Sequence, residues 1–279
     1  MSGMKQRVVS ALIFVPSLIV IVLIPYANHL AFALAVIAVT YLGSKEFNDL
    51  LSKEQNDLSI MAFSGIFLPI AQYAQNVFFP NSELTFYILM FLICLTFIVE
   101  IFRGAKDDFK GTWERNSKTV LNIIYPGLFA SFLVKLCFFE HPVHWMLLFF
   151  ALVCGSDTFA FLIGMAFGRN NKGIIKASPN KSVAGFIGAL AVPALIGMGA
   201  AMIFSEFHIN GFLGFLLGLI TSFAGCVGDL IESTFKRAAS VKDSGKVVMG
   251  RGGIMDTIDS IIMAAPVYCF LHFIAFSVL

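Results

Sequence analysis

Two segments near the carboxyl end of the chain place acidic side chains inside apolar sequence. In the first, the polar residues stand at i, i+3, i+4 and i+7 and so share one face of a helix; they are Asp229, Glu232, Ser233 and Lys236. In the second, the spacing i, i+3, i+4 does the same for Asp256, Asp259 and Ser260. We expect two helices that present carboxylates at the same membrane depth and are joined by one glycine-rich basic segment.

These carboxylates lie too deep to remain without a partner. Lys236 and Arg237 mark the polar end of the first helix, so Asp229 lies about two turns, or roughly 10 Å, inside the apolar zone. A carboxylate at that depth needs a metal or another cation. Carboxylates accompanied by lysine and arginine, without histidine, are the ligand set by which Mg²⁺ holds phosphate oxygens. The two segments therefore predict phosphate chemistry supported by magnesium.

Two polar connections could supply groups that contact phosphate. Connection 236–253 combines a predicted turn at Asp243-Ser244-Gly245 with a flexible basic loop at Gly250-Arg251-Gly252-Gly253. Connection 169–182 ends in a predicted helix start at Ser178-Pro179-Asn180-Lys181-Ser182, where free N–H groups beside Lys181 would attract an anion. The alternative is an ordinary basic loop, but the coincidence of cap, lysine and glycines favours phosphate binding.

Three other acidic residues can be explained by a structural role rather than by a role in chemistry. Asp157 shares a predicted helix face with Phe161, Gly164 and Gly168, which indicates either a close helix contact or a ligand site. Both interpretations stay open. Glu46 and the nearby Asp49 follow an early apolar segment, and we interpret both as solvated charges at the membrane interface.

The composition requires a membrane protein. Hydrophobic residues make up 58% of 279 and charged residues only 13%, whereas soluble domains carry about 25% charged residues. A span needs roughly 20 mostly apolar residues, and we predict about nine transmembrane helices in an all-α fold. They lie near 8–26, 29–44, 59–79, 84–102, 118–139, 144–168, 183–204, 211–235 and 254–279. The first is not expected to be a cleaved signal peptide, because no small-residue cleavage site ends it.

The basic residues define the orientation. Of 19 lysines and arginines, 18 fall at the amino terminus and in every second connection, and only Lys135 stands inside a span. The positive-inside bias therefore predicts a cytoplasmic amino terminus and an outer carboxyl terminus. Histidines fall on or near the outer side; they are His29, His141, His144, His208 and His272. A histidine base or a histidine-ligated metal on the cytoplasmic face is therefore not expected.

The polar motifs gather in the second half of the chain. We interpret residues 1–140 as a helical membrane scaffold of about five spans and residues 141–279 as the catalytic region, with cytoplasmic loops 169–182 and 236–253. The cysteines show no regular spacing that would indicate a disulfide framework or a zinc site; they are Cys94, Cys137, Cys154, Cys226 and Cys269.

The run from Ser233 to Ser260 resembles the phosphatidate cytidylyltransferase (CDP-diacylglycerol synthase) family in the pattern SxFKRxxxxKDSG…GxGGxxDxxDS. Further matches cover most of the chain: Lys5-Gln6-Arg7, Ser10-Ala11, Asp157-Thr158, Ser178-Pro179-x-Lys181, Gly228-Asp229-Leu230 and Ala264-Ala265-Pro266. The resemblance implies cytidylyl transfer from CTP to phosphatidic acid in the bilayer, giving CDP-diacylglycerol and pyrophosphate for phospholipid biosynthesis. It implies Mg²⁺ as cofactor, with a second metal that is Mg²⁺ or K⁺.

The resemblance also implies roles for residues. Asp229 and Asp256 would hold the metals with Ser233 close by, and Lys236 and Asp259 would complete the catalytic set. Substrate contacts would come from Asp157, Ser178, Lys181, Arg237, Lys242, Asp243, Ser244, Arg251, Gly252 and Gly253. We expect a bacterial cytoplasmic membrane, membrane lipids as surroundings and no nucleic-acid partner. A homodimer is one option for the oligomeric state.

The chain departs from the family pattern at four positions. Gly250-Arg251-Gly252-Gly253 stands for the usual GHGG, Thr257 for the arginine of DRxD, Met249 for a proline and Ala184 for a glutamate. The acids expected to bind metal are intact. Three alternatives stay open: a divergent inactive paralogue, another CTP-dependent lipid transferase or kinase, and a cation-coupled transporter. The transporter would need ionisable residues along the whole membrane depth and an inverted repeat. In this chain the acidic and basic residues instead lie in the predicted cytoplasmic half of the membrane depth.

Overall fold

The structure is a computed structural model that describes residues 3–51, 60–171, 173, 175–248, 250 and 252–277. Met249 and Arg251, two of the departures named above, lie outside the described residues. The described chain is helical and contains no named strand, although Val248 and Gly252 form an isolated antiparallel bridge. This confirms the all-α prediction.

The helices follow the predicted apolar segments closely. They are α1 (Gly3–Val22), α2 (Tyr26–Leu51), η1 (Ile60–Ile66), α3 (Phe67–Phe78), α4 (Leu84–Gly104), α5 (Thr112–Asn122), η2 (Ile123–Leu128), α6 (Phe129–Leu136), α7 (Pro142–Phe167), α8 (Val183–Ile203), α9 (Gly211–Ala238) and α10 (Met255–Ser277), with a short turn η3 at Ser205–Phe207. Within the described chain, seven helical stretches are long and apolar enough to cross a membrane. This confirms a polytopic helical membrane protein. The count of nine stays a prediction.

Several predicted boundaries differ from the helix ends by a few residues, and the largest difference is at the end of α2. The second span was expected to end near residue 44, whereas α2 continues to Leu51. The extension is amphipathic, since Phe47 and Leu50 are buried while Lys45 and Asp49 face outward. This additional helix carries Glu46 toward the interior of the protein.

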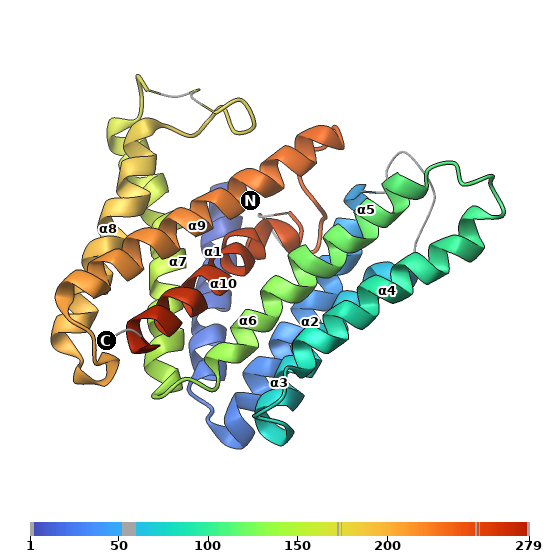
Figure 1. Cartoon of the computed structure of the whole chain (residues 1–279). Helices are drawn as coiled ribbons and strands as arrows, with labels where there is room; N and C mark the ends of the chain where they lie inside the picture. Colours follow the sequence, from blue (N-terminus) through green and yellow to red (C-terminus); the bar gives the residue numbers. More distant parts are fainter. Residues whose placement is uncertain are drawn as a thin grey trace.

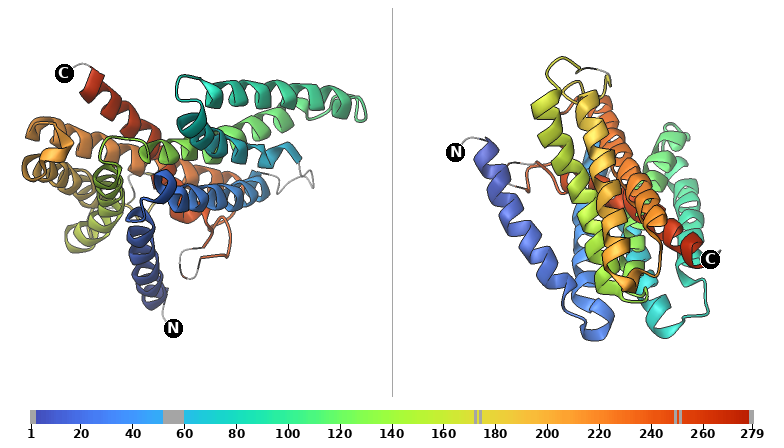
Figure 2. Two further views of the ribbon diagram at one scale, coloured as in Figure 1. Left: turned by 90° about the horizontal axis from the view of Figure 1, so that it is seen from below. Right: turned by 90° about the vertical axis from the view of Figure 1, so that its left-hand side faces the viewer.

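The helices form two groups with α10 between them (Figure 1). On one side α8 packs against α7 and α9, and on the other α2 to α6 lie together. The remaining helix, α1, stands at the side of the bundle and contacts α2 and α7 (Figure 2). Helix α10 packs against α9 and α6 and so connects the groups.

Small residues allow the helices of the first group to approach closely. A Cβ atom at Gly218 of α9 would lie only 2.9 Å from the Cα of Ala194 in α8. Gly185 of α8 meets Gly164 of α7 in the same way, since its Cβ would lie 2.7 Å from the carbonyl oxygen of Ala160. Small residues at such contacts are typical of membrane helix pairs. Gly164, which shares the predicted helix face of Asp157, is thus a packing residue.

The connections rich in lysine and arginine share one end of the bundle. Figure 1 shows the α4–α5, α7–α8 and α9–α10 connections at that end and the α3–α4, α6–α7 and α8–α9 connections at the other. We call the first end the basic end. That it faces the cytoplasm stays a prediction.

The main hydrophobic core draws on the whole chain. Its buried members include Phe47 and Tyr125 from the first half and Phe149, Ile262 and Tyr268 from the second. The five cysteines are all free, as their spacing predicted. The division at residue 140 stays a prediction.

Candidate active site

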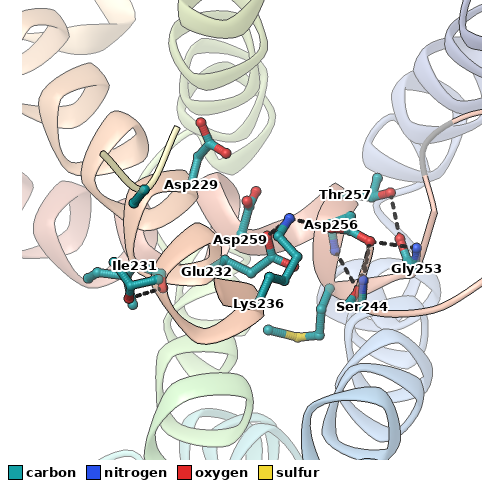
Figure 3. A network of polar contacts seen from close by, with 12 residues as sticks. Asp229, Ile231, Glu232, Lys236, Ser244, Gly253, Asp256, Thr257 and Asp259 are labelled. Atoms are coloured by element: carbon teal, nitrogen blue, oxygen red, sulfur yellow. Dashed lines mark hydrogen bonds and ion pairs between the residues drawn. The ribbon is translucent and has the colours of Figure 1, made fainter. Parts of the chain in front are cut away.

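Lys236 joins the two acidic helices at the basic end. Its ammonium group pairs with Glu232 one turn earlier on α9 and lies 2.5 Å from Oδ1 of Asp256 on α10. Glu232 is completely buried, and apart from this ion pair its carboxylate oxygens have no hydrogen-bond partner among the described residues. One lysine therefore balances two carboxylates from two helices (Figure 3).

Asp256 is fixed by four donors. Its Oδ2 accepts hydrogen bonds from the backbone N–H of Ser244 at 2.8 Å, the hydroxyl of Ser244 at 2.9 Å and the backbone N–H of Gly253 at 2.8 Å. Its Oδ1 accepts from Lys236. Asp256 lies in the first turn of α10, where the helix dipole also favours negative charge. The connection predicted to form a turn thus folds back onto the carboxylate.

Gly252 must be glycine for this arrangement. Its φ is +112°, which side chains with a Cβ rarely adopt. A Cβ there would also lie 2.6 Å from Oδ2 of Asp256. The glycine-rich motif therefore allows the backbone to approach the carboxylate of Asp256 closely. Close beside it, the hydroxyl of Thr257 donates to the carbonyl of Gly253 at 3.1 Å.

The α7–α8 connection reaches the same face of α9. Lys181 forms an ion pair with Asp229, and Nε of Arg237 donates to the carbonyl of Ala177 at 3.3 Å. Ser182 caps α8 as expected, since its hydroxyl accepts from the N–H of Gly185 at 3.1 Å. Ser178 is half-buried in the same connection. The two predicted polar connections thus converge on one helix.

The other predicted site residues lie around this network. Asp259 is buried, accepts from the N–H of Ser260 at 2.6 Å, and lies between Asp229 and Glu232 in Figure 3. Ser233 is buried on α9. Asp157 is exposed on α7, and Lys242 and Asp243 are exposed in the α9–α10 connection.

Glu46 is the residue that sequence reasoning misplaced. Expected as a solvated charge, it is only 8% exposed, and its Oε2 accepts from the N–H of Met255 at 3.0 Å and from the hydroxyl of Ser244 at 3.4 Å. Asp49 is exposed, in agreement with the same prediction. The signal was available in the pattern of α2, because Gly43, Phe47 and Leu50 define a buried face that also includes Glu46.

Tyr125 is a second contribution from the first half of the chain. Its hydroxyl donates to the carbonyl of Gly228, next to Asp229, at 3.3 Å. Its ring packs against both Phe47 and Phe235, with centroid separations of 5.4 and 6.0 Å. Tyr125 lies in η2, a π-helical stretch containing Pro126. Such stretches often occur at functional sites.

The donor set fits a metal that uses substrate oxygens. Within the described chain, no three side chains among histidine, cysteine, aspartate and glutamate lie close enough to hold a metal by themselves. Mg²⁺ is usually held by one or two carboxylates together with phosphates and water. Asp229 and Asp256 are carboxylates of this kind, and in the structure each is paired with a lysine.

Comparisons with known proteins identify the family of this chain. The profile of the cytidylyltransferase family matches residues 5–275. A phosphatidate cytidylyltransferase from Haemophilus influenzae is 29% identical over 296 residues, covering 97% of this chain and 99% of that protein. One from Staphylococcus haemolyticus is 30% identical over 267 residues, covering 94% and 96%. The chain therefore belongs to the cytidylyltransferase family, which confirms the resemblance seen in its sequence.

Proposed function

We propose that this protein is a phosphatidate cytidylyltransferase, which transfers the cytidylyl group of CTP to phosphatidic acid. Its relatives from Haemophilus influenzae and Staphylococcus haemolyticus bear that name. The observation that carries the proposal is the pair of lysine–carboxylate contacts, Lys181 with Asp229 and Lys236 with Asp256, at one end of the helix bundle. Both lysines are cations placed beside acids suited to magnesium.

The proposed reaction is a displacement at phosphorus. A phosphate oxygen of phosphatidic acid attacks the α-phosphorus of CTP, and the bond from that phosphorus to the oxygen bridging to the β-phosphorus breaks. The products are CDP-diacylglycerol and pyrophosphate, and the leaving oxygen carries away the electron pair. Both reactants are anions, so the site must above all neutralise and orient phosphates.

The lysines have two sets of partners in this proposal. In the structure they balance Asp229 and Asp256. When substrate is bound, their ammonium groups would contact phosphate oxygens, and Asp229 and Asp256, with Ser233 nearby, would hold Mg²⁺. Bound Mg²⁺ supplies charge neutralisation at the phosphate oxygens. Lysine is a common point-charge ligand for phosphate.

The surroundings of the site suit a lipid substrate and a soluble nucleotide. The acidic residues lie on apolar helices, and the basic connections lie at the same end of the bundle (Figure 1). Phosphatidic acid would reach the site from the bilayer and CTP from the cytoplasm. We propose the cytoplasmic membrane as the location, with the basic end inside.

The deciding experiment is an assay of the purified protein with CTP and phosphatidic acid, with and without Mg²⁺. We expect CDP-diacylglycerol and pyrophosphate in equal amounts, dependent on Mg²⁺. ATP in place of CTP and diacylglycerol in place of phosphatidic acid serve as controls. A phosphorylated lipid together with CDP would indicate a lipid kinase, and no product from folded protein would indicate the inactive paralogue.

A further inference from the structure

Among the residues that the structure describes, Glu46 is the one carboxylate from the first half of the chain that contacts the turn around Asp256. It comes from α2, 209 positions before its partner Met255 in sequence. Met255 is the first residue of α10, and its N–H is one of the donors that the helix cannot satisfy internally. A carboxylate supplied by another helix therefore caps α10 next to Asp256.

The contacts of Glu46 and Asp256 meet at Ser244. The Ser244 hydroxyl lies 2.9 Å from Oδ2 of Asp256 and 3.4 Å from Oε2 of Glu46, while its backbone N–H donates to Asp256. Loss of Glu46 would leave the buried N–H of Met255 without its acceptor and would free one side of Ser244. The position of Asp256 relative to Lys236 would then be less well defined.

The space next to Gly245 supports the same conclusion. All three atoms nearest to a Cβ built at Gly245 belong to the Glu46 carboxyl group, and that Cβ would lie 2.7 Å from its Cδ. A Cβ at Gly253 would likewise meet Glu46 and Ser244. Two glycines of the connection thus leave room for the Glu46 carboxyl group.

We propose that Glu46 is a positioning residue for the transferase site: it caps α10 and holds the turn 243–256, so that Asp256 stays aimed at Lys236 and at the metal. This inference rests on the proposed function for its effect on rate. It assigns a role to a residue outside the motif region and outside the predicted catalytic half.

The test compares Glu46→Ala and Glu46→Gln with Asp49→Asn, which removes an exposed carboxylate one turn further along α2. We expect Glu46→Ala to lower kcat by about 10- to 100-fold, the scale of an ångström-level misplacement. Hydrogen exchange should rise in residues 244–256 and stay unchanged elsewhere. Glu46→Gln should remain close to the wild-type rate, because an amide oxygen can still accept from Met255. Asp49→Asn should change neither readout.

A double-mutant cycle with Gly245→Ala separates positioning from general damage. In the wild-type background the added methyl group displaces the Glu46 carboxyl group and should lower kcat. In the Glu46→Ala background the space is free, so Gly245→Ala should cause little further loss. The proposal would be overturned if the losses of kcat in the two single variants multiply in the double variant. It would also be overturned if hydrogen exchange became faster throughout the protein. If the wild type makes no CDP-diacylglycerol, the proposed function fails, and the local exchange result still decides whether Glu46 holds the turn.

Discussion

The ammonium group of Lys236 lies 2.5 Å from Oδ1 of Asp256, and the same group pairs with the fully buried Glu232. The separation of 20 positions between Lys236 and Asp256 spans the α9–α10 connection. The contact therefore closes the loop that carries Ser244 and Gly253. The lysine that is proposed to bind substrate phosphate is thus also the one that balances two carboxylates of the fold.

Replacement of Lys236 by Met should destabilise the protein strongly. Glu232 would stay buried without a counter-charge, and breaking a buried pair of this kind costs about 3–5 kcal/mol. Thermal unfolding in detergent measures the effect, with Lys242→Met as the control, since Lys242 is exposed in the same connection. Adding Glu232→Gln to Lys236→Met should recover part of the loss. An unfolding temperature equal to that of the wild type would contradict the assigned ion pair.

Asp229→Asn and Asp256→Asn should each remove nearly all turnover. Both acids are proposed to hold the metal whose charge stabilises the transferring group. Both variants should still insert into the membrane and run as folded species in detergent. CTP turnover at saturating Mg²⁺ is the measurement, and a wild-type rate in either variant would show that the metal assignment is wrong.

The local elements of this site could be predicted from the sequence. Helical spacing grouped Glu232 with Lys236, and the cap at Ser182 followed from a polar residue before an apolar run. Periodicity could also have shown that Glu46 faces the interior, because it shares a face with Phe47 and Leu50.

The pairings across the fold could not be predicted. Nothing in local spacing indicates that Lys181 meets Asp229 or that Glu46 meets Met255, because each contact depends on which helices become neighbours. The charges in the sequence are compatible with several acidic partners for each lysine. Where α2 approaches the start of α10, Gly43 lies against the side chain of Met255, and no motif marks that contact.

Membrane orientation gives a separate prediction. Lys110 is exposed in the α4–α5 connection, and Ser205 is exposed near His208 at the opposite end of the bundle. In a chain without its native cysteines, Lys110→Cys should react only with a reagent supplied from the cytoplasm, and Ser205→Cys only with one supplied from outside. The reverse labelling pattern would place the basic end outside, away from cytoplasmic CTP.

The last prediction concerns Arg251, which stands where the family pattern has histidine. Its neighbours Gly250 and Gly252 both have positive φ, and Val248 and Gly252 exchange two backbone hydrogen bonds of 2.7 and 3.0 Å. Gly252 in turn lies beside Asp256. Because the connection links the two acidic helices, we expect Arg251 to act as a permanent phosphate clamp. Arginine is always charged, whereas histidine is charged only below about pH 6.5.

Arg251→Ala should therefore weaken CTP use by about 10- to 100-fold, the scale of one or two charge-assisted hydrogen bonds. Arg251→His should restore much of that rate, and more at pH 6 than at pH 8, because protonation returns the positive charge. Rates of CTP turnover for wild type and both variants across that pH range provide the measurement. Wild type serves as the internal control, since arginine keeps its charge throughout. An Arg251→Ala variant as active as wild type would show that this position does not contact phosphate.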